Sequence, residues 1–246
     1  MGFARVLATL LFVVALPVAL VTTNIRLLAN SPLTYDYAFD RYNAEEATGL
    51  AREDLDSTGK ALRDYFNNDE ATFYHEVTED GLETPVFNAR ETRHLEDVKG
   101  LLVGVNRLQE LTLVYVLAYI VAFFIWAREG MVRQLATQSL IGLGVGLLAI
   151  AGVGIFAATG FDAAWDRFHE VAFPGGGWEF DADSDRLIQM FPEAFWRDAV
   201  IFLGVMCAAE AAIIAAVAVV YLFGSRGERT RLTSAIDVHA STTQAA

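Results

Sequence analysis

The chain has 246 residues, of which 54% are hydrophobic and 20% are charged, and its formal net charge is −13. A mean hydropathy of +0.35 excludes a disordered chain, because disorder needs low hydrophobicity with high net charge. With 18 basic residues against 31 acidic ones, the composition also excludes a nucleic-acid-binding surface. The single cysteine, Cys207, excludes an intramolecular disulfide and a thiolate zinc site. The combination predicts apolar segments in lipid that alternate with acidic segments in water.

Four apolar stretches are long enough to cross a bilayer, which takes roughly 17–25 residues per helix. They cover residues 6–21, 111–127, 140–158 and 199–223. Because Arg5 precedes the first stretch, a signal peptide is an alternative there. No clear small-x-small cleavage site follows, so we favour an uncleaved helix.

Basic residues beside these stretches predict the orientation, since Lys and Arg accumulate on the cytoplasmic side. One side carries Arg5, Arg128, Arg133, Arg226, Arg229 and Arg231. Both termini are therefore expected in the cytoplasm, with the protein as a multi-pass component of the plasma membrane. The two segments that face outward, 26–110 and 159–198, contain 27 of the 31 acidic residues and 12 of the 18 basic ones.

The predicted fold is that of an all-α integral membrane protein with four transmembrane helices and a mostly helical extracytoplasmic cap. The cap is formed by the two outer segments. The chain divides into a first transmembrane helix, a long outer segment, two transmembrane helices with a short cytoplasmic link, a second outer segment, a fourth transmembrane helix and a disordered tail: residues 1–25, 26–110, 111–158, 159–198, 199–223 and 224–246.

The first outer segment shows one clear helix start. Asn88 followed by Glu91 resembles a capping box, in which the two residues satisfy each other's exposed N–H groups. Apolar residues then recur at helical spacing over 95–108, which predicts a helix that continues into the second span or bends near Asn106. The polar stretch 67–85 before it is predicted to be a loop or a short hairpin.

The second outer segment is rich in aromatic residues and glycine. Trp165 and Trp196 are typical of a membrane interface, where an apolar ring with a polar N–H is favoured. Pro192 with Glu193 suits the first turn of a helix leading into the fourth span. Residues 174–177, Pro-Gly-Gly-Gly, predict a tight turn or a close approach of the backbone to another group.

Two features lie inside the predicted spans. Gly142 and Gly146 form a small-xxx-small face, which permits close packing of helices in lipid. Glu210 is a carboxyl group inside the fourth span, where an ionisable side chain is costly and suggests a function. We favour a hydrogen bond that holds the helix bundle together over a proton relay.

His94 and His169 are the strongest candidates for chemistry, because each lies near the outer end of a span. Each could also be an ordinary surface histidine. Asp97 shares a helix face with His94, and Glu170 adjoins His169, so either acid could orient its imidazole. Two such histidines could perform general acid–base catalysis. The other two histidines, His75 and His239, are expected to be solvated and idle.

Metal sites are weakly supported. The spacing of Asp181, Asp183 and Asp185 imitates the start of a calcium loop but lacks its glycine and its final glutamate. His94, His169 and a carboxylate could hold zinc, although no HExxH-type spacing is present. We therefore expect no metal and no cofactor.

Two strings resemble the motifs of a bacterial membrane protein family. Residues 93–99, Arg-His-Leu-Glu-Asp-Val-Lys, resemble its His-x-x-Asp-Val-Lys motif. Residues 168–181, Phe-His-Glu-Val-Ala-Phe-Pro-Gly-Gly-Gly-Trp-Glu-Phe-Asp, resemble its second motif, which continues through 185–188 and 191–193. This is the family of the lipoprotein intramolecular transacylases, and its layout of four spans with a long first outer segment is similar.

The resemblance implies an acyltransferase that needs no cofactor. Such enzymes move an acyl chain from the middle ester of the glycerol to the α-amine of the N-terminal diacylglyceryl-cysteine of bacterial lipoproteins. Their catalytic histidines correspond to His94 and His169. An oxyanion would need donors. Candidates are the backbone of Gly175, Gly176 and Gly177 or a cation such as Lys99 or Arg186, and Trp178 lies in the same motif.

The expected partners are membrane lipids and diacylglyceryl-lipoproteins. Two alternatives remain at this point: a membrane metallohydrolase that uses the same histidines, and a non-enzymatic envelope scaffold or sensor whose acidic outer surface binds a partner. Geometry discriminates between them, since rings of His94 and His169 more than about 10 Å apart could not share a proton-transfer site.

Overall fold

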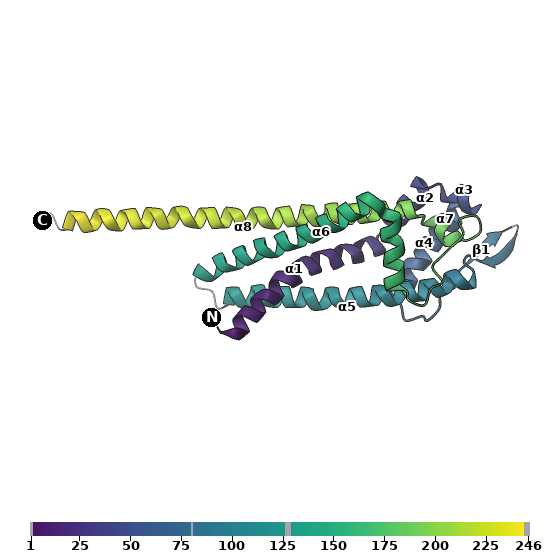
Figure 1. Cartoon of the computed structure of the whole chain (residues 1–246), viewed down its shortest axis with the longest axis horizontal. Coiled ribbons are helices and arrows are strands. Elements are labelled where there is room, and N and C mark those ends of the chain that lie inside the picture. The colour runs from purple at the N-terminus through teal and green to yellow at the C-terminus, as the bar shows by residue number, and fades with distance from the viewer. Residues whose placement is uncertain (1, 80, 126–128, 244–246) are drawn as a thin grey trace. The chain divides into compact units, whose positions relative to one another are not determined.

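The computed structural model describes residues 2–79, 81–125 and 129–243, with side chains for 2–79, 81–125, 131–155 and 160–224. Within these residues, four helices are long and apolar enough to cross a membrane, which confirms the predicted class. They are α1 (Phe3–Asn30), α5 (Ala89–Ile125), α6 (Glu129–Ala172) and α8 (Glu193–Thr243) (Figure 1). The predicted end of the second span at Ala127, and Arg128 of the predicted link, lie outside the described residues.

The helices are longer than the apolar stretches that predict them. Helix α5 has 37 residues, about 55 Å at about 1.5 Å per residue, whereas a bilayer core is about 30 Å thick. It runs through Asn106 without a break, so the cap helix and the second span are one helix. The first turns of α5, which contain His94, lie well before residue 111, where the predicted span begins.

Helix α8 differs from the prediction at its C-terminal end. Its helical backbone continues to Thr243 and includes most of the tail 224–246 that was expected to be disordered. The physical reason is that the tail contains no proline and, after Gly224, a single glycine, Gly227. A helix already formed in the span therefore meets no strong breaker there.

Helix α6 is interrupted at Gly160, whose φ of 177° and ψ of 67° are not helical. The residues that follow, up to Ala172, form a separate helical stretch with a different direction (Figure 1). This second stretch of α6 carries His169.

The chain forms two compact units. The first consists of Met1–Ala19, Thr112–Leu148 and Ala208–Ala246, which are parts of α1, α5, α6 and α8. A polar network joins its helices: the hydroxyl of Tyr119 donates to Gln138 Oε1 at 3.0 Å, and Gln138 Nε2 donates to Thr9 Oγ1 at 3.0 Å. Polar side chains within an apolar bundle satisfy one another in this way.

The predicted close packing at the glycines of the third span is confirmed within the first unit. A Cβ atom placed on Gly142 would lie 2.9 Å from the carbonyl oxygen of Val13, and one on Gly146 would lie 2.5 Å from Cβ of Pro17. Both distances are too short for a side chain, so α1 and α6 pack this closely because these positions are glycine. Glu210, also in this unit, is half-buried, and its bundle-locking role stays a prediction.

The second unit consists of Leu20–Leu111 and Ala149–Cys207. Its smaller elements are α2 (Pro32–Arg41), α3 (Ala44–Thr48), α4 (Arg52–Phe66), β1 (Glu76–Glu79), β2 (Leu82–Pro85) and α7 (Arg186–Met190). Strands β1 and β2 form an antiparallel hairpin with Glu76 opposite Pro85, which is the hairpin alternative of the prediction.

One apolar core holds the elements of the second unit together. Its members come from α2, α3, α4, the hairpin region, the first turns of α5, α7 and the start of α8. The largest fully buried side chains among them are Tyr65, Leu55, Leu62, Met190, Val77 and Val86. At the start of α8, Asp198 adds a polar contact, because its Oδ2 accepts hydrogen bonds from the hydroxyls of Tyr42 and Tyr37 at 2.6 and 2.7 Å.

Candidate active site

The structure brings His94 of α5 and His169 of α6 together in the second unit. Their ring centroids are 5.9 Å apart and their planes differ by 25°. Both side chains are buried, with 8% and 6% of the residue surface exposed. The separation is well inside the limit of about 10 Å for a shared proton-transfer site, which works at hydrogen-bond reach or through one water.

Aromatic rings surround this histidine pair. Phe173 and Phe180 approach His94 with centroid distances of 4.8 and 5.3 Å, and both meet it edge-on. Trp165 and Trp178 lie 4.4 and 4.8 Å from the ring of His169. The rings exclude water from the imidazoles and fix their orientation by edge and face contacts. All four rings come from the aromatic-rich second outer segment.

The tautomer of His169 follows from one hydrogen bond. Its Nδ1 lies 2.9 Å from the carbonyl oxygen of Trp165, four residues earlier in the same helical stretch. A carbonyl oxygen accepts, so Nδ1 carries the proton and donates, which leaves the lone pair of a neutral ring on Nε2. Burial lowers the pKa of His169, opposed by this hydrogen bond and by the negative charge of Asp166.

His94 is held neutral more strongly. Burial, and then repulsion from a protonated His169, lowers the pKa of His94 to about 4. Its Nδ1 is fully buried and has no hydrogen-bond partner among the described residues. A buried polar atom left unpaired costs free energy, and in native proteins such atoms are exceptions that call for an explanation. A substrate group that hydrogen-bonds to this nitrogen would remove the penalty.

The two acids expected to orient the histidines do not contact them. Asp97 is exposed and makes no described hydrogen bond with His94. Glu170 is exposed and accepts a hydrogen bond from Arg167 at 2.6 Å instead. Helical spacing placed Asp97 near His94, and adjacency in the sequence placed Glu170 near His169, but both side chains reach solvent. The groups that act on His169 are the Trp165 carbonyl and the charge of Asp166, and no sequence pattern singled out either of them.

The two candidate cations are engaged in the cap. Lys99 donates to Asn68 Oδ1 at 2.9 Å and to the carbonyl of Glu70 at 2.6 Å. Arg186 forms an ion pair with Glu79 and donates to the carbonyl of Val86 at 3.4 Å. Neither has a described contact with the histidine pair, so both hold the cap together.

The glycine run forms a turn directly after Phe173. The N–H of Gly176 donates to the carbonyl of Phe173 at 3.0 Å, so this N–H is already used. Gly176 and Gly177 have φ values of 70° and 85°, which disfavour a side chain and account for glycine at both positions. Among the described residues, the N–H groups of Gly175 and Gly177 have no hydrogen-bond partner.

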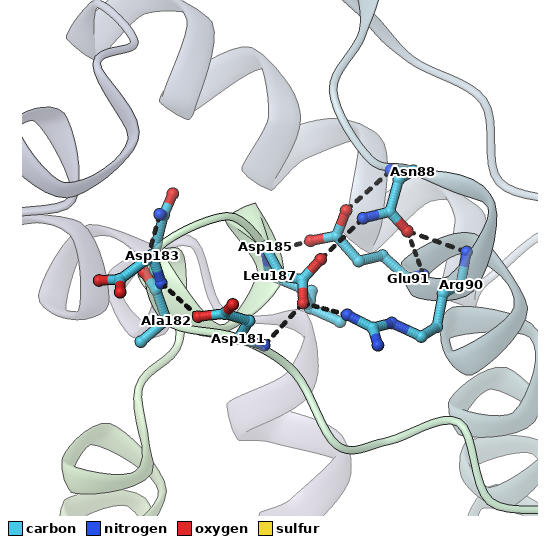
Figure 2. A network of polar contacts seen from close by, with 9 residues as sticks. Asn88, Arg90, Glu91, Asp181, Ala182, Asp183, Asp185 and Leu187 are labelled. Atoms are coloured by element: carbon cyan, nitrogen blue, oxygen red, sulfur yellow. Dashed lines mark hydrogen bonds and ion pairs between the residues drawn. The ribbon is translucent and has the colours of Figure 1, made fainter.

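A polar network joins the start of α5 to the loop before α7 (Figure 2). The predicted capping box is confirmed, because Asn88 N–H donates to Glu91 Oε2 at 2.7 Å and Asn88 Oδ1 accepts from the N–H of Glu91 at 3.1 Å. Asp185 Oδ1 accepts from Asn88 Nδ2 at 2.8 Å, and Asp185 Oδ2 accepts from the N–H of Asp181 at 2.7 Å. Arg90 completes the network with an ion pair to Asp185.

The polar network, rather than a metal ion, engages the carboxylates of Asp181 and Asp185, whose spacing imitates a calcium loop. Burial alone would raise the pKa of Asp185, but the N–H of Asp181, Asn88 and Arg90 outweigh it and lower the pKa. Its carboxylate oxygens are therefore occupied by protein donors, and Asp181 Oδ1 accepts from the N–H of Asp183 at 3.0 Å. Across the described residues there is no group of three or more His, Cys, Asp or Glu side chains placed to hold a metal ion.

Comparison with known proteins gives a family match. The model of the family "lipoprotein intramolecular transacylase Lit" matches residues 10–196. An uncharacterised protein of Aquifex aeolicus is 28% identical over 120 residues, which cover 49% of this chain and 50% of the relative. The matched region thus spans about half the length of that curated relative.

Solved structures match over more of the chain. The in meso structure of the membrane integral lipoprotein intramolecular transacylase Lit from Bacillus cereus has a TM-score of 0.71 and 16% sequence identity. The match covers 92% of this chain and 99% of the other. Two structures of the same protein with one histidine substituted give the same score, with 96% of that chain covered. At this identity the likeness establishes a shared fold.

Proposed function

The chain belongs to the lipoprotein intramolecular transacylase family, and we propose that it makes lyso-form lipoproteins with His94 and His169 as proton-transfer groups. The reaction moves an acyl chain from the middle ester of the glyceryl group to the α-amine of the N-terminal cysteine. The observation that carries the proposal is the pair of buried imidazoles 5.9 Å apart, one from each family motif.

The state of the histidines suits this chemistry. An α-amine attacks only when neutral, yet its ordinary pKa is about 8. His169 presents an unprotonated Nε2 because its Nδ1 is tied to the Trp165 carbonyl, so Nε2 can accept a proton from the attacking amine. As the new C–N bond forms and the ester C–O bond breaks, a proton must reach the departing glycerol oxygen. The ring centroid of His94 lies 5.9 Å from that of His169. His94 can therefore take the proton from His169, directly or through one water, and deliver it to the glycerol oxygen.

The surroundings lower the barrier in two further ways. Amine and ester belong to one molecule, so a pocket that folds the substrate converts the attack into a ring closure worth several kcal/mol. The N–H groups of Gly175 and Gly177 are candidate donors for the oxyanion of the tetrahedral intermediate. Around the imidazoles themselves, the rings of Trp165, Trp178 and Phe180 lower the local dielectric, so hydrogen bonds made there are stronger than in water.

The exposed surface beside the pair favours a lipid substrate. Phe168, Val171 and Trp196 expose 43%, 70% and 38% of their surface. Phe168 contacts the ring of His169, and Trp196 stacks on Trp165 at 5.3 Å. Apolar side chains exposed next to a polar site are typical of an interfacial helix whose apolar face lies in the headgroup region. The acyl chains would stay in lipid while the ester reaches the histidines. In the orientation that the basic residues predict, with both termini in the cytoplasm, the two outer segments and the site face the extracytoplasmic side.

The decisive experiment is expression in a lipoprotein-producing bacterium that lacks its own N-acylating enzymes, followed by mass spectrometry of lipoprotein N-termini. We expect the wild type to yield N-acyl lyso-form lipopeptides, and His94→Ala and His169→Ala to yield none while still accumulating in the membrane. His75→Ala is the matched control, since His75 contacts Ser57 and lies outside the pair. Lyso-form product in both histidine variants, or none with the wild type, would overturn the proposal.

A further inference from the structure

Two buried carboxylates in the second unit lie outside the histidine pair. Glu91 and Asp185 expose 2% and 3% of their surface, although buried acidic residues are rare unless paired. Removing a carboxylate from water is unfavourable unless hydrogen bonds replace the lost hydration. Each of these two therefore needs partners that the fold supplies, and their partners come from segments nearly a hundred residues apart.

Glu91 caps the start of α7, and Asp185 binds the side chain of the residue that caps α5. Glu91 in the first turn of α5 accepts the N–H of Leu187 at the start of α7, at 2.6 Å from Oε1. Asp185, directly before α7, accepts the side-chain N–H of Asn88, directly before α5, at 2.8 Å. The start of α5 thus supplies an acceptor for the first turn of α7, and Asp185 in turn holds the capping side chain of Asn88 (Figure 2). These two bonds fix the loop 181–185 against the first turn of α5.

Arg90 connects this network to the histidine pair. Its guanidinium pairs with Asp185 and also lies over the ring of Phe180, with 5.5 Å between Cζ and the ring centroid. The ring of Phe180 in turn meets His94 edge-on at 5.3 Å. A planar guanidinium can hold a carboxylate and stack on an aromatic ring at once, which a lysine ammonium cannot do with the same geometry. The contacts therefore run from Asp185 through Arg90 and Phe180 to His94.

We propose that Asp185, Arg90 and Glu91 are positioning residues that hold Phe180 on His94 and thereby set the geometry of the histidine pair. A misplacement of reacting groups by about 1 Å can lower a rate by about 100-fold. The effect on rate that we expect from this network therefore rests on the proposed function. Among the described residues, no hydrogen bond or ion pair joins any of the three to either imidazole. Their effect passes through Phe180 and through the loop that carries it.

The kinetic test uses purified protein in detergent with a synthetic diacylglyceryl-lipopeptide. Arg90→Ala and Asp185→Asn should each lower kcat by about 10- to 100-fold with little change in KM. Asp183→Asn, in the same loop and exposed, is the matched control and should leave both constants unchanged. Phe180→Leu should lower kcat similarly, and the Asp185→Asn, Phe180→Leu double variant should be no slower than the slower single variant. Additive effects, or unchanged kcat in Arg90→Ala, would refute the positioning role.

A second readout does not depend on activity. Diethyl pyrocarbonate modifies accessible neutral imidazoles, and mass spectrometry can assign the modified residue. His94 should react several-fold faster in Arg90→Ala and Asp185→Asn than in the wild type or Asp183→Asn. Unchanged reactivity of His94 would contradict the inference even if the wild type proves inactive as a transacylase. Faster reactivity with an inactive wild type would instead retain the positioning network and reject the transacylase proposal.

Discussion

The burial of His94 predicts a specific sensitivity to acid. The folded pKa of about 4 lies below the ordinary value of 6.5. As the pH falls through about 6.5, the unfolded chain therefore binds the proton before the folded one does. The stability that comes from burying a neutral His94 is fully present above about pH 6.5 and is lost as the pH falls toward about 4.

The size of the effect follows from the shift. At about pH 5, linkage gives a loss of about 2 kcal/mol relative to neutral pH, with one pKa unit equal to about 1.4 kcal/mol. For a chain of this length, about 1 kcal/mol moves Tm by about 2–4 °C, so the expected shift is about 4–8 °C. Other buried groups titrate in the same range, and a matched variant is needed to isolate the part due to His94.

The variant is His94→Leu, which fills the site with an apolar side chain that cannot be protonated. Thermal unfolding in detergent, followed by tryptophan fluorescence, is compared for wild type and variant between about pH 7.5 and about pH 4.5. We expect the wild type to lose stability relative to the variant as the pH falls, over and above any constant offset from altered packing. A difference in Tm that stays constant across this range would refute the assignment of a buried, neutral His94.

Further predictions concern packing, turns and the pH dependence of the reaction. Gly146→Leu should lower the free energy of unfolding by about 1–3 kcal/mol, and with it Tm, because the new side chain would collide with Pro17. Gly144→Leu, with open space around it, should leave Tm nearly unchanged. Gly177→Ala should destabilise by about 1–2 kcal/mol because its φ is 85°, and Gly175→Ala, without a positive φ, should not, which Tm measurements would show. If Gly177→Ala changes neither Tm nor lyso-form yield, the turn has no strict need for glycine. In the proposed reaction both histidines start neutral, so kcat/KM should rise with pH up to the pKa of the substrate amine; a rate that falls over that range in a pH profile would contradict this.

The spans and the helix starts could be predicted because their signals are local. Apolar length gave the four membrane helices, and the spacing of Asn88 and Glu91 gave the start of α5. A capping box acts within one turn, so a stretch of four residues contains both of the groups that form it. The same holds for Gly142 and Gly146, whose small size matters wherever the partner helix lies.

The electrostatic partners of the histidines could not be predicted in this way. Helical spacing identified Asp97 as a neighbour of His94, and adjacency in the sequence identified Glu170 as a neighbour of His169. The direction that a side chain takes, however, depends on what packs against the helix. The group that fixes the tautomer of His169 is a backbone carbonyl, and every residue has one. Likewise, the spacing of Asp181, Asp183 and Asp185 resembled a metal loop. Two of the donors to Asp185, Asn88 and Arg90, are about a hundred residues away and could not be paired with it from sequence.

The acidic character of the outer segments and the neutrality of the histidine pair fit one reaction. Most acidic side chains in these segments are exposed, and an acidic surface attracts a cationic α-amine at long range in low salt. The pair itself is buried among aromatic rings, where burial lowers the pKa of both His94 and His169. The same desolvation would lower the pKa of an ammonium group that enters, because burial disfavours any charged form. In the proposed reaction, the outer surface therefore favours the charged amine on approach, and the aromatic site favours the neutral amine that attacks.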